Sequence, residues 1–187
     1  MNNKTKTMVG ISLLTAIVVV LQLMGTPLKL GMFAGAVALL PIVVGAGLYG
    51  WKAGAWLGFA FGTTVLLSGD AAPFLAISIP GTVLTVLAKG SGCGAVAGLM
   101  HQLLAKANKT VAAYVAAIVA PMVNSGIFAI GCYLFFYQDL AAWNAGAYAN
   151  TTAYIFLGLI GLNFFVELGT SVLLAPVITR LIKIGSK

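Results

Sequence analysis

The chain has 187 residues, of which 61% are apolar and only 7% are charged. Soluble domains carry roughly 25% charged residues, so this composition cannot cover a water-soluble surface and instead indicates a polytopic helical membrane protein. Transmembrane strands would alternate apolar and polar residues over about ten positions, whereas the apolar runs here are continuous. The net charge of +7 does not indicate nucleic-acid binding, because the cations are scattered through short loops.

Six apolar segments approach the roughly 20 residues that a helix needs to cross a bilayer. The second and third are short and rich in Gly and Ala, so we expect tilt or irregularity there, and Pro41 would kink the second. We predict an all-α membrane protein in which residues 1–187 form one domain of six transmembrane helices. The predicted spans are Met8–Met24, Met32–Tyr49, Ala53–Ser68, Ile77–Leu104, Thr110–Phe136 and Thr151–Ile182.

Positive charges follow this predicted topology. Eight cations fall on one side of it, and the other side holds Lys29, Asp70 and Asp139. The positive-inside rule then places both termini in the cytoplasm, with the first span retained rather than cleaved as a signal peptide. The eight cations are Lys4, Lys6, Lys52, Lys106, Lys109, Arg180, Lys183 and Lys187.

Catalytic and metal-binding motifs are missing from the sequence. It contains no GxxxxGK[ST] loop for ATP, and its single histidine, His101, cannot form an HExxH metal site. Cys93 and Cys132 lie in apolar segments without CxxC spacing, which indicates buried small side chains. We therefore expect a protein that is not an enzyme and that carries no cofactor or metal.

Lys89 lies near the middle of the fourth apolar segment. A charge in hydrocarbon costs several kcal/mol, so such a residue normally faces a partner or a cavity. With a rise of about 1.5 Å per residue, Lys89 lies roughly 18 Å deep, and Asn124 and Asn163 reach the same depth in the next two spans. Glu167 follows Asn163 by four residues, on the same face and one turn further along.

Two interpretations of this polar group remain open. Lys89 and Glu167 could form an intramembrane ion pair, with the asparagines satisfying the remaining hydrogen bonds. Alternatively, Lys89, Asn124 and Asn163 line a cavity for a polar solute. The glycines at 90, 92 and 94 also have two possible roles. They permit close approach of a ligand, or they permit tight helix packing.

The outer loops and the first span supply further candidates. The second outer loop mixes turn-forming residues with an aromatic residue, Phe74. Trp143 and Tyr148 in the third outer loop are either interfacial belt residues or part of a lid over a pocket. Ser12 and Ala16 form a small-xxx-small pair on the first span, which favours close packing against another helix.

Taken together, the chain resembles the substrate-binding S component of an energy-coupling factor (ECF) vitamin transporter. The resemblance covers nearly the whole chain and includes its length, the six spans with both ends inside, and the basic N-terminus before a small-xxx-small helix. Four segments also carry it: Leu40–Gly45 (LPIVVG), Gly50–Ala55 (GWKAGA), Leu87–Gly90 (LAKG) and Pro121–Gly126 (PMVNSG).

This resemblance implies a mechanism and a set of partners. An S component of the bacterial cytoplasmic membrane binds one vitamin in an outward-facing pocket under a lid of outer loops. It then docks on a transmembrane scaffold subunit that two ATPase subunits drive. Ser12 and Ala16 would contact the scaffold subunit.

The Lys/Asn pair on spans four and five is similar to the Arg/Asn pair expected in pantothenate-specific members. Lys89 would pair with the pantothenate carboxylate, and Asn124 and Asn163 would bond its hydroxyl and amide groups. Lysine in place of arginine loses the planar bidentate fork, which is a departure from that pattern. The candidate substrate-binding residues are Lys89, Asn124, Asn163, Thr85, Phe128 and Phe74.

Alternatives follow if Glu167 neutralises Lys89. A neutral ring such as riboflavin or a pyridoxine-type vitamin would then fit, stacked on Trp56, Phe74 or Phe128. A structural or regulatory membrane subunit without a ligand would instead have Lys89 fully paired with Glu167 and no cavity open to the outside. A channel would need oligomerisation, because one lysine per chain does not form a ring of charge.

Overall fold

Helices form nearly all of the computed structural model, which describes residues 3–25 and 32–185 and contains no strand among them. The all-α class predicted from composition is therefore confirmed. In chain order the elements are α1 (Asn3–Gly25), α2 (Met32–Tyr49), α3 (Trp51–Ser68), α4 (Ala72–Ile77), α5 (Ile79–Leu104), α6 (Lys109–Gly131), the π-helix η1 (Cys132–Phe136), α7 (Tyr137–Asn144), α8 (Thr151–Ala153), the π-helix η2 (Tyr154–Gly161) and α9 (Leu162–Gly185).

Four continuous helical stretches are long and apolar enough to cross a membrane, among the described residues. The chain is thus consistent with a membrane-embedded helical protein. Helices α2 and α3 have 18 residues each and fall outside that set. The four stretches are Lys4–Met24, Ile79–Leu104, Lys109–Asn144 and Thr151–Gly185.

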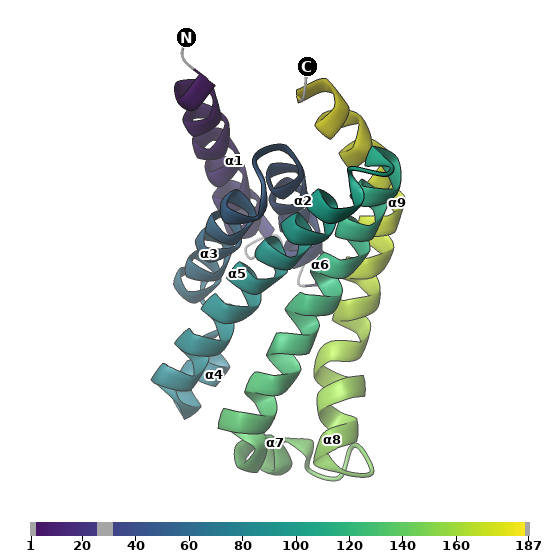
Figure 1. Cartoon of the computed structure of the whole chain (residues 1–187). Helices are drawn as coiled ribbons and strands as arrows, with labels where there is room; N and C mark the ends of the chain where they lie inside the picture. The colour runs from purple at the N-terminus through teal and green to yellow at the C-terminus, as the bar shows by residue number, and fades with distance from the viewer. Residues whose placement is uncertain (1–2, 26–31, 186–187) are drawn as a thin grey trace.

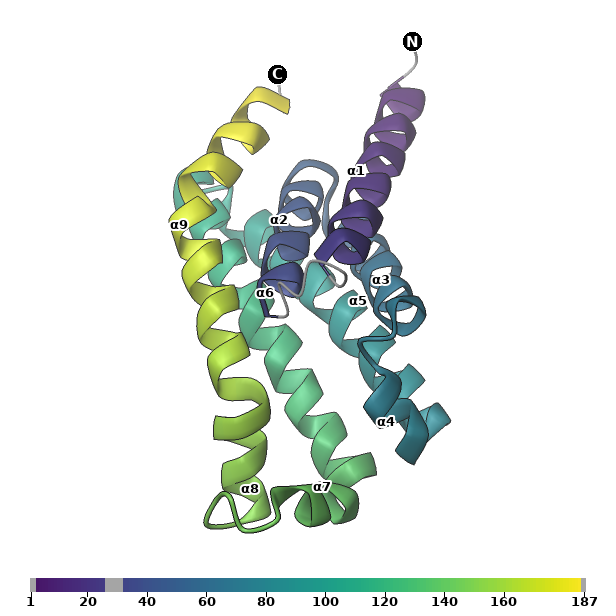
Figure 2. The same cartoon turned by 180° about the vertical axis from the view of Figure 1, so that it is seen from behind.

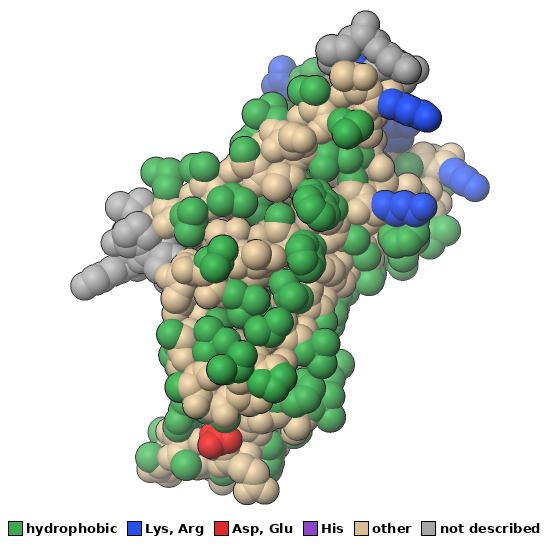
Figure 3. Space-filling view, turned by 90° about the vertical axis from the view of Figure 1, so that its left-hand side faces the viewer, with side chains coloured by type: hydrophobic (Ala, Val, Ile, Leu, Met, Phe, Trp, Pro, Cys, Tyr) green, Lys and Arg blue, Asp and Glu red, His purple; other side chains and the backbone are tan. Residues whose placement is uncertain are grey.

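The helices run between two ends of the molecule (Figures 1 and 2). The start of α1, the end of α9 and the turns joining α2 to α3 and α5 to α6 lie toward one end, and α4, α7 and α8 lie toward the other. On the face shown in Figure 3, Lys and Arg side chains gather near one end and an acidic side chain lies near the opposite end. Basic and acidic side chains are therefore separated along the long axis on this face.

Local sequence explains where the helices around the polar group begin. Ser78 caps α5, and its hydroxyl accepts from the Gly81 amide at 3.2 Å. Asn108 caps α6 through its side-chain oxygen, which accepts from Thr110 N at 2.8 Å. Such caps satisfy amides that have no partner inside the helix. Gly50, with φ 89°, makes the turn between α2 and α3 in a conformation that favours glycine.

Close glycine contacts join α3 to α5. A Cβ atom built on Gly58 would overlap the carbonyl oxygen of Gly90, and one built on Gly54 would overlap that of Gly94. Tight packing is therefore the arrangement that the structure shows for Gly90 and Gly94. Gly92 differs, because it faces the Ile127 side chain of α6.

One predicted boundary is wrong in detail. Ile77 ends the short helix α4, and Ser78 interrupts the helix before α5 starts at Ile79. The third outer loop contains a helix, α7, and the predicted last span forms one continuous helical stretch made up of α8, η2 and α9. Lys29 and Lys187, which the topology prediction used, lie outside the described residues.

Candidate functional site

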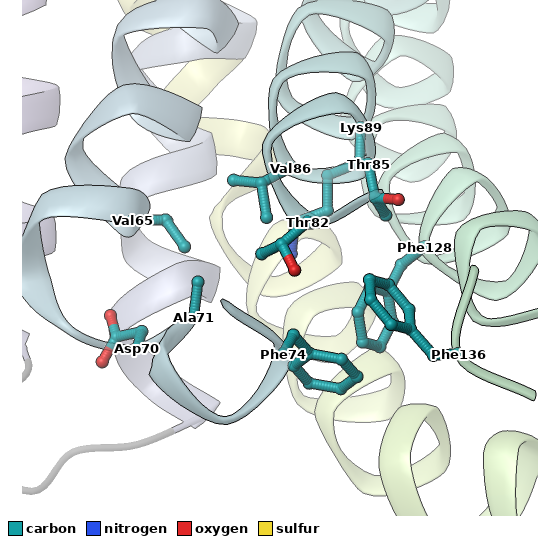
Figure 4. Close-up of a pocket in the computed structure, with 10 residues that line it drawn as sticks. All are labelled: Val65, Asp70, Ala71, Phe74, Thr82, Thr85, Val86, Lys89, Phe128 and Phe136. Atoms are coloured by element: carbon teal, nitrogen blue, oxygen red, sulfur yellow. The ribbon is translucent and has the colours of Figure 1, made fainter. Parts of the chain in front are cut away.

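Two neighbouring cavities share Lys89 and Phe128 as lining residues. The first, which we call the aromatic cavity, has a volume of about 140 Å³. The second, which we call the polar cavity, has a volume of about 200 Å³. Besides the two shared residues, the aromatic cavity is lined by Val65, Asp70, Ala71, Phe74, Thr82, Thr85, Val86 and Phe136 (Figure 4). The polar cavity is lined by Asn124, Ser125, Leu159, Ile160 and Asn163.

The Lys89 ammonium group lies over an aromatic face rather than against an acid. Its Nζ atom is 5.0 Å from the centroid of the Phe128 ring. Within the described part of the chain, Lys89 has no hydrogen bond and no acidic oxygen within 4.0 Å. A desolvated cation–π contact contributes about 2 kcal/mol, which is less than the cost of burying a charge. The lysine is therefore only partly compensated.

Glu167 makes direct hydrogen bonds with two amides in place of the ion pair considered for Lys89. Its side chain is 2% exposed. Asn124 Nδ2 donates to its two oxygens at 3.1 and 3.3 Å, and Asn163 Nδ2 donates at 2.9 Å. Glu167 still attracts Lys89 through space, but the two groups are not in contact. The two amides supply the hydrogen bonds that the carboxylate needs, so it can be buried without touching the lysine.

Two buried oxygen atoms beside Lys89 have no hydrogen-bond partner among the described residues. They are Thr85 Oγ1 and Asn124 Oδ1. Thr85 lies one helical turn before Lys89 and lines the aromatic cavity, and Asn124 lines the polar cavity. An unpaired buried polar atom costs about 1–3 kcal/mol, so each is a place where a bound group could contribute.

Aromatic rings close the aromatic cavity beside α4. The Phe74 ring on this short helix packs against Phe128, Phe136 and Trp143, with centroid distances of 5.5, 5.1 and 5.7 Å. Trp143 in α7 therefore touches a residue that lines the cavity, although 40% of its surface is exposed. Figure 4 shows Phe74, Phe128 and Phe136 grouped on one side of the cavity.

Hydrogen bonds around Asp70 join the first helix to the rim of the aromatic cavity. Gln22 Nε2 in α1 donates to Asp70 Oδ2 at 2.6 Å, and the Ser68 hydroxyl donates to the same atom at 2.9 Å. Sequence reasoning missed Gln22 as a partner of the outer loop. The sequence did offer a sign of this role, because Gln22 is a polar residue near the end of an apolar span.

All six candidate substrate-binding residues line one or both cavities. Trp56, which was considered for stacking, lies elsewhere: it is 52% exposed and donates to Thr15 Oγ1 at 3.3 Å. Thr82 and Phe136 also line the aromatic cavity and were not predicted. Phe74 and Thr85 line the aromatic cavity, and Asn124 and Asn163 line the polar cavity. Lys89 and Phe128 line both.

Within the described residues, no group of three His, Cys, Asp or Glu side chains is arranged to hold a metal ion. Cys93 and Cys132 are buried free thiols. The fold and site thus define a helical, membrane-embedded protein with an internal polar site. Comparisons with protein-family models, with curated proteins and with solved structures find no match to this chain.

Proposed function

We propose that this protein is a vitamin-binding S component of an ECF-type importer in the bacterial cytoplasmic membrane, with pantothenate as the leading substrate. In this proposal six helices span the membrane, both termini are cytoplasmic, and the aromatic and polar cavities form the substrate site. The chain binds substrate from the outside and is not itself an enzyme.

The state of Lys89 carries this proposal. Its ammonium group lines both cavities and has no acidic partner within 4.0 Å among the described residues. Inside a membrane such a charge normally marks a binding site or a pathway. An anionic solute would supply the missing partner, and hydrogen bonds to charged groups contribute about 1.5–3 kcal/mol. A purely structural subunit would have needed Lys89 fully paired.

The distribution of charge supports the proposed orientation. Lys and Arg side chains gather toward one end of the molecule, on the face shown in Figure 3. That end also contains the start of α1, the end of α9 and two of the turns (Figure 1). By the positive-inside rule it is the cytoplasmic end, so α4 and the aromatic cavity beneath it face outward.

Docking on a scaffold subunit is consistent with the surface of α1. Ser12 and Ala16 are both exposed, one helical turn apart. Small side chains on an exposed stripe let another helix approach closely in a membrane. The sequence has no nucleotide-binding loop of its own. In this proposal, two ATPase subunits would provide the energy.

Pantothenate matches the residues that line the cavities. Its carboxylate would meet Lys89, and its hydroxyl and amide groups would meet Asn124 and Asn163. The rings of Phe74, Phe128 and Phe136 favour a second candidate, a riboflavin or pyridoxine-type vitamin stacked in the aromatic cavity. A non-binding structural subunit is the remaining alternative.

Lys89→Met tests the proposal directly. We expect wild-type protein purified in detergent to carry a small anionic molecule detectable by mass spectrometry, and to gain thermal stability on addition of pantothenate. Lys89→Met should weaken binding by about 2 kcal/mol or more, on the order of a buried charged contact, without lowering stability. Lys52→Met, at an exposed lysine in α3, is the matched control and should bind normally. Unchanged affinity in Lys89→Met, or no bound or stabilising vitamin in the wild type, would refute the proposal.

A further inference from the structure

The orientation of two amide groups limits what the polar cavity can bind. An ionised carboxylate only accepts hydrogen bonds, so an amide that bonds to it must present its NH2 group. Asn124 and Asn163 both donate their Nδ2 atoms to Glu167. Their carbonyl oxygens are consequently left to accept from other groups, while Asn163, whose Nδ2 atom donates one bond, also keeps a second N–H.

The unpartnered oxygen of Asn124 is a second observation at the same place. Asn124 is 3% exposed, and its Oδ1 atom has no hydrogen-bond partner in the described part of the chain. Asn163 Oδ1 makes no hydrogen bond within those residues either, and both asparagines line the polar cavity beside Lys89. The lining of the cavity therefore contains one cation and two amides whose carbonyl oxygens make no hydrogen bond within the described residues.

We propose that Glu167 is a positioning residue that turns Asn124 and Asn163 into acceptors, so that the site selects an anion that also carries N–H or O–H donors. The inference rests on the proposed function and specifies the chemistry of its substrate. Glu167 acts indirectly, because it is 2% exposed and lines neither cavity. Unfunctionalised fatty acids would meet Lys89 but leave both amide oxygens unpaired.

The sequence matched the asparagines to the hydroxyl and amide groups of a substrate but did not say which partner donates each hydrogen bond. The structure supplies a direction for the two amide oxygens: they accept and the ligand donates. A ligand that presents only acceptor oxygens or ring nitrogens to the polar cavity would leave both oxygens without a partner. Hydroxy acids, N-acyl amino acids and related amide carboxylates are the class that fits.

Selectivity between two probes tests the inference. Pantothenate carries a carboxylate with hydroxyl and amide donors, and nonanoate is a carboxylate of similar length without them. We expect wild-type protein to bind pantothenate at least 10-fold more tightly than nonanoate. In Glu167→Gln the new amide can donate to an asparagine oxygen and reverse that asparagine, so pantothenate affinity should fall at least 10-fold while nonanoate affinity changes less than 3-fold.

Two further variants keep the test decisive if Glu167→Gln does not fold. Asn163→Ala removes one acceptor and should also reduce the preference for pantothenate. Ser171→Ala is the control. Ser171 lies one turn beyond Glu167, is 1% exposed and lines neither cavity. The Ser171→Ala protein should therefore prefer pantothenate over nonanoate as strongly as the wild type does.

Each outcome separates this inference from the proposed function. Equal preference for pantothenate in wild type, Glu167→Gln and Asn163→Ala would overturn the role of Glu167 and leave binding at Lys89 standing. The same holds if the molecule that co-purifies with the protein is an anion without donors. Binding of neither probe, together with no co-purified anion, would overturn the proposed function itself and this inference with it.

Discussion

Two kinds of position on helix α5 differ in how they meet their neighbours. Toward α3, Gly90 and Gly94 lie so close to Gly58 and Gly54 that no Cβ atom could be added. Lys89, on the same helix, borders two cavities and has no acidic partner within 4.0 Å among the described residues. The helix is thus tightly packed at these glycines and incompletely satisfied at Lys89.

The contrast separates stability from binding. Backbone contacts between α3 and α5 leave little freedom for the helix that carries Lys89 and Thr85. Variants at the glycine contact should therefore change stability, and Lys89→Met should change binding.

Gly58→Ala should give the largest loss of stability. The added methyl group would meet the carbonyl of Gly90, and a backbone atom cannot move aside as a flexible side chain can. Overpacking in a tight interior typically costs about 1–3 kcal/mol, and we expect the upper end of this range for unfolding in detergent.

Gly126→Ala on α6 is the matched control for this effect. A Cβ atom there meets nothing within 4 Å, so the greater helix propensity of alanine should stabilise the protein by up to about 1 kcal/mol. Equal stability of the two variants would show that the α3–α5 contact is not a tight interface.

Asn124→Ala should give an intermediate effect. It removes the amide that donates to both oxygens of Glu167 and leaves this 2% exposed carboxylate with the Asn163 hydrogen bond. Under-satisfying a buried charged group costs about 1–3 kcal/mol, which chemical denaturation can measure. Ser171→Ala deletes a buried hydroxyl that has no partner among the described residues, so its stability should stay within about 0.5 kcal/mol of wild type. A stable Asn124→Ala protein would contradict the hydrogen bonds between Asn124 and Glu167.

Sequence patterns predicted the helical class and six of the residues that line the two cavities. Long apolar runs determine helix positions, so the bounds of α2 and the end of α5 matched residue for residue. Depth along a helix follows from its rise, which is why the sequence alone could group the residues that line the polar cavity. Lys89, Asn124 and Asn163 do line one cavity.

Contacts between side chains were beyond reach of the same reasoning. Depth places Lys89 and Glu167 within one turn of each other but does not say which neighbours each one contacts. Which neighbours each side chain contacts depends on how the helices are rotated about their axes. In the structure, α6 and α9 bring both asparagines to Glu167. Outer elements such as α4 were also missed, since a six-residue helix carries too short a pattern to recognise.

Phe74→Leu should lower stability less than Gly58→Ala, and it should also change how fast a bound vitamin dissociates. Phe74 contacts three rings, and each aromatic pair contributes about 0.5–1.5 kcal/mol, part of which leucine recovers through burial, so we expect a loss of about 1 kcal/mol. Because the ring connects α4 to Phe136 and Trp143 above the aromatic cavity, its loss should also speed dissociation of a bound vitamin about 5-fold, on the scale of that same energy. Phe165→Leu, at a ring that is 68% exposed, should leave dissociation unchanged. Equal dissociation rates in both variants would mean that the site opens by another route and that the aromatic group on α4 only stabilises the fold.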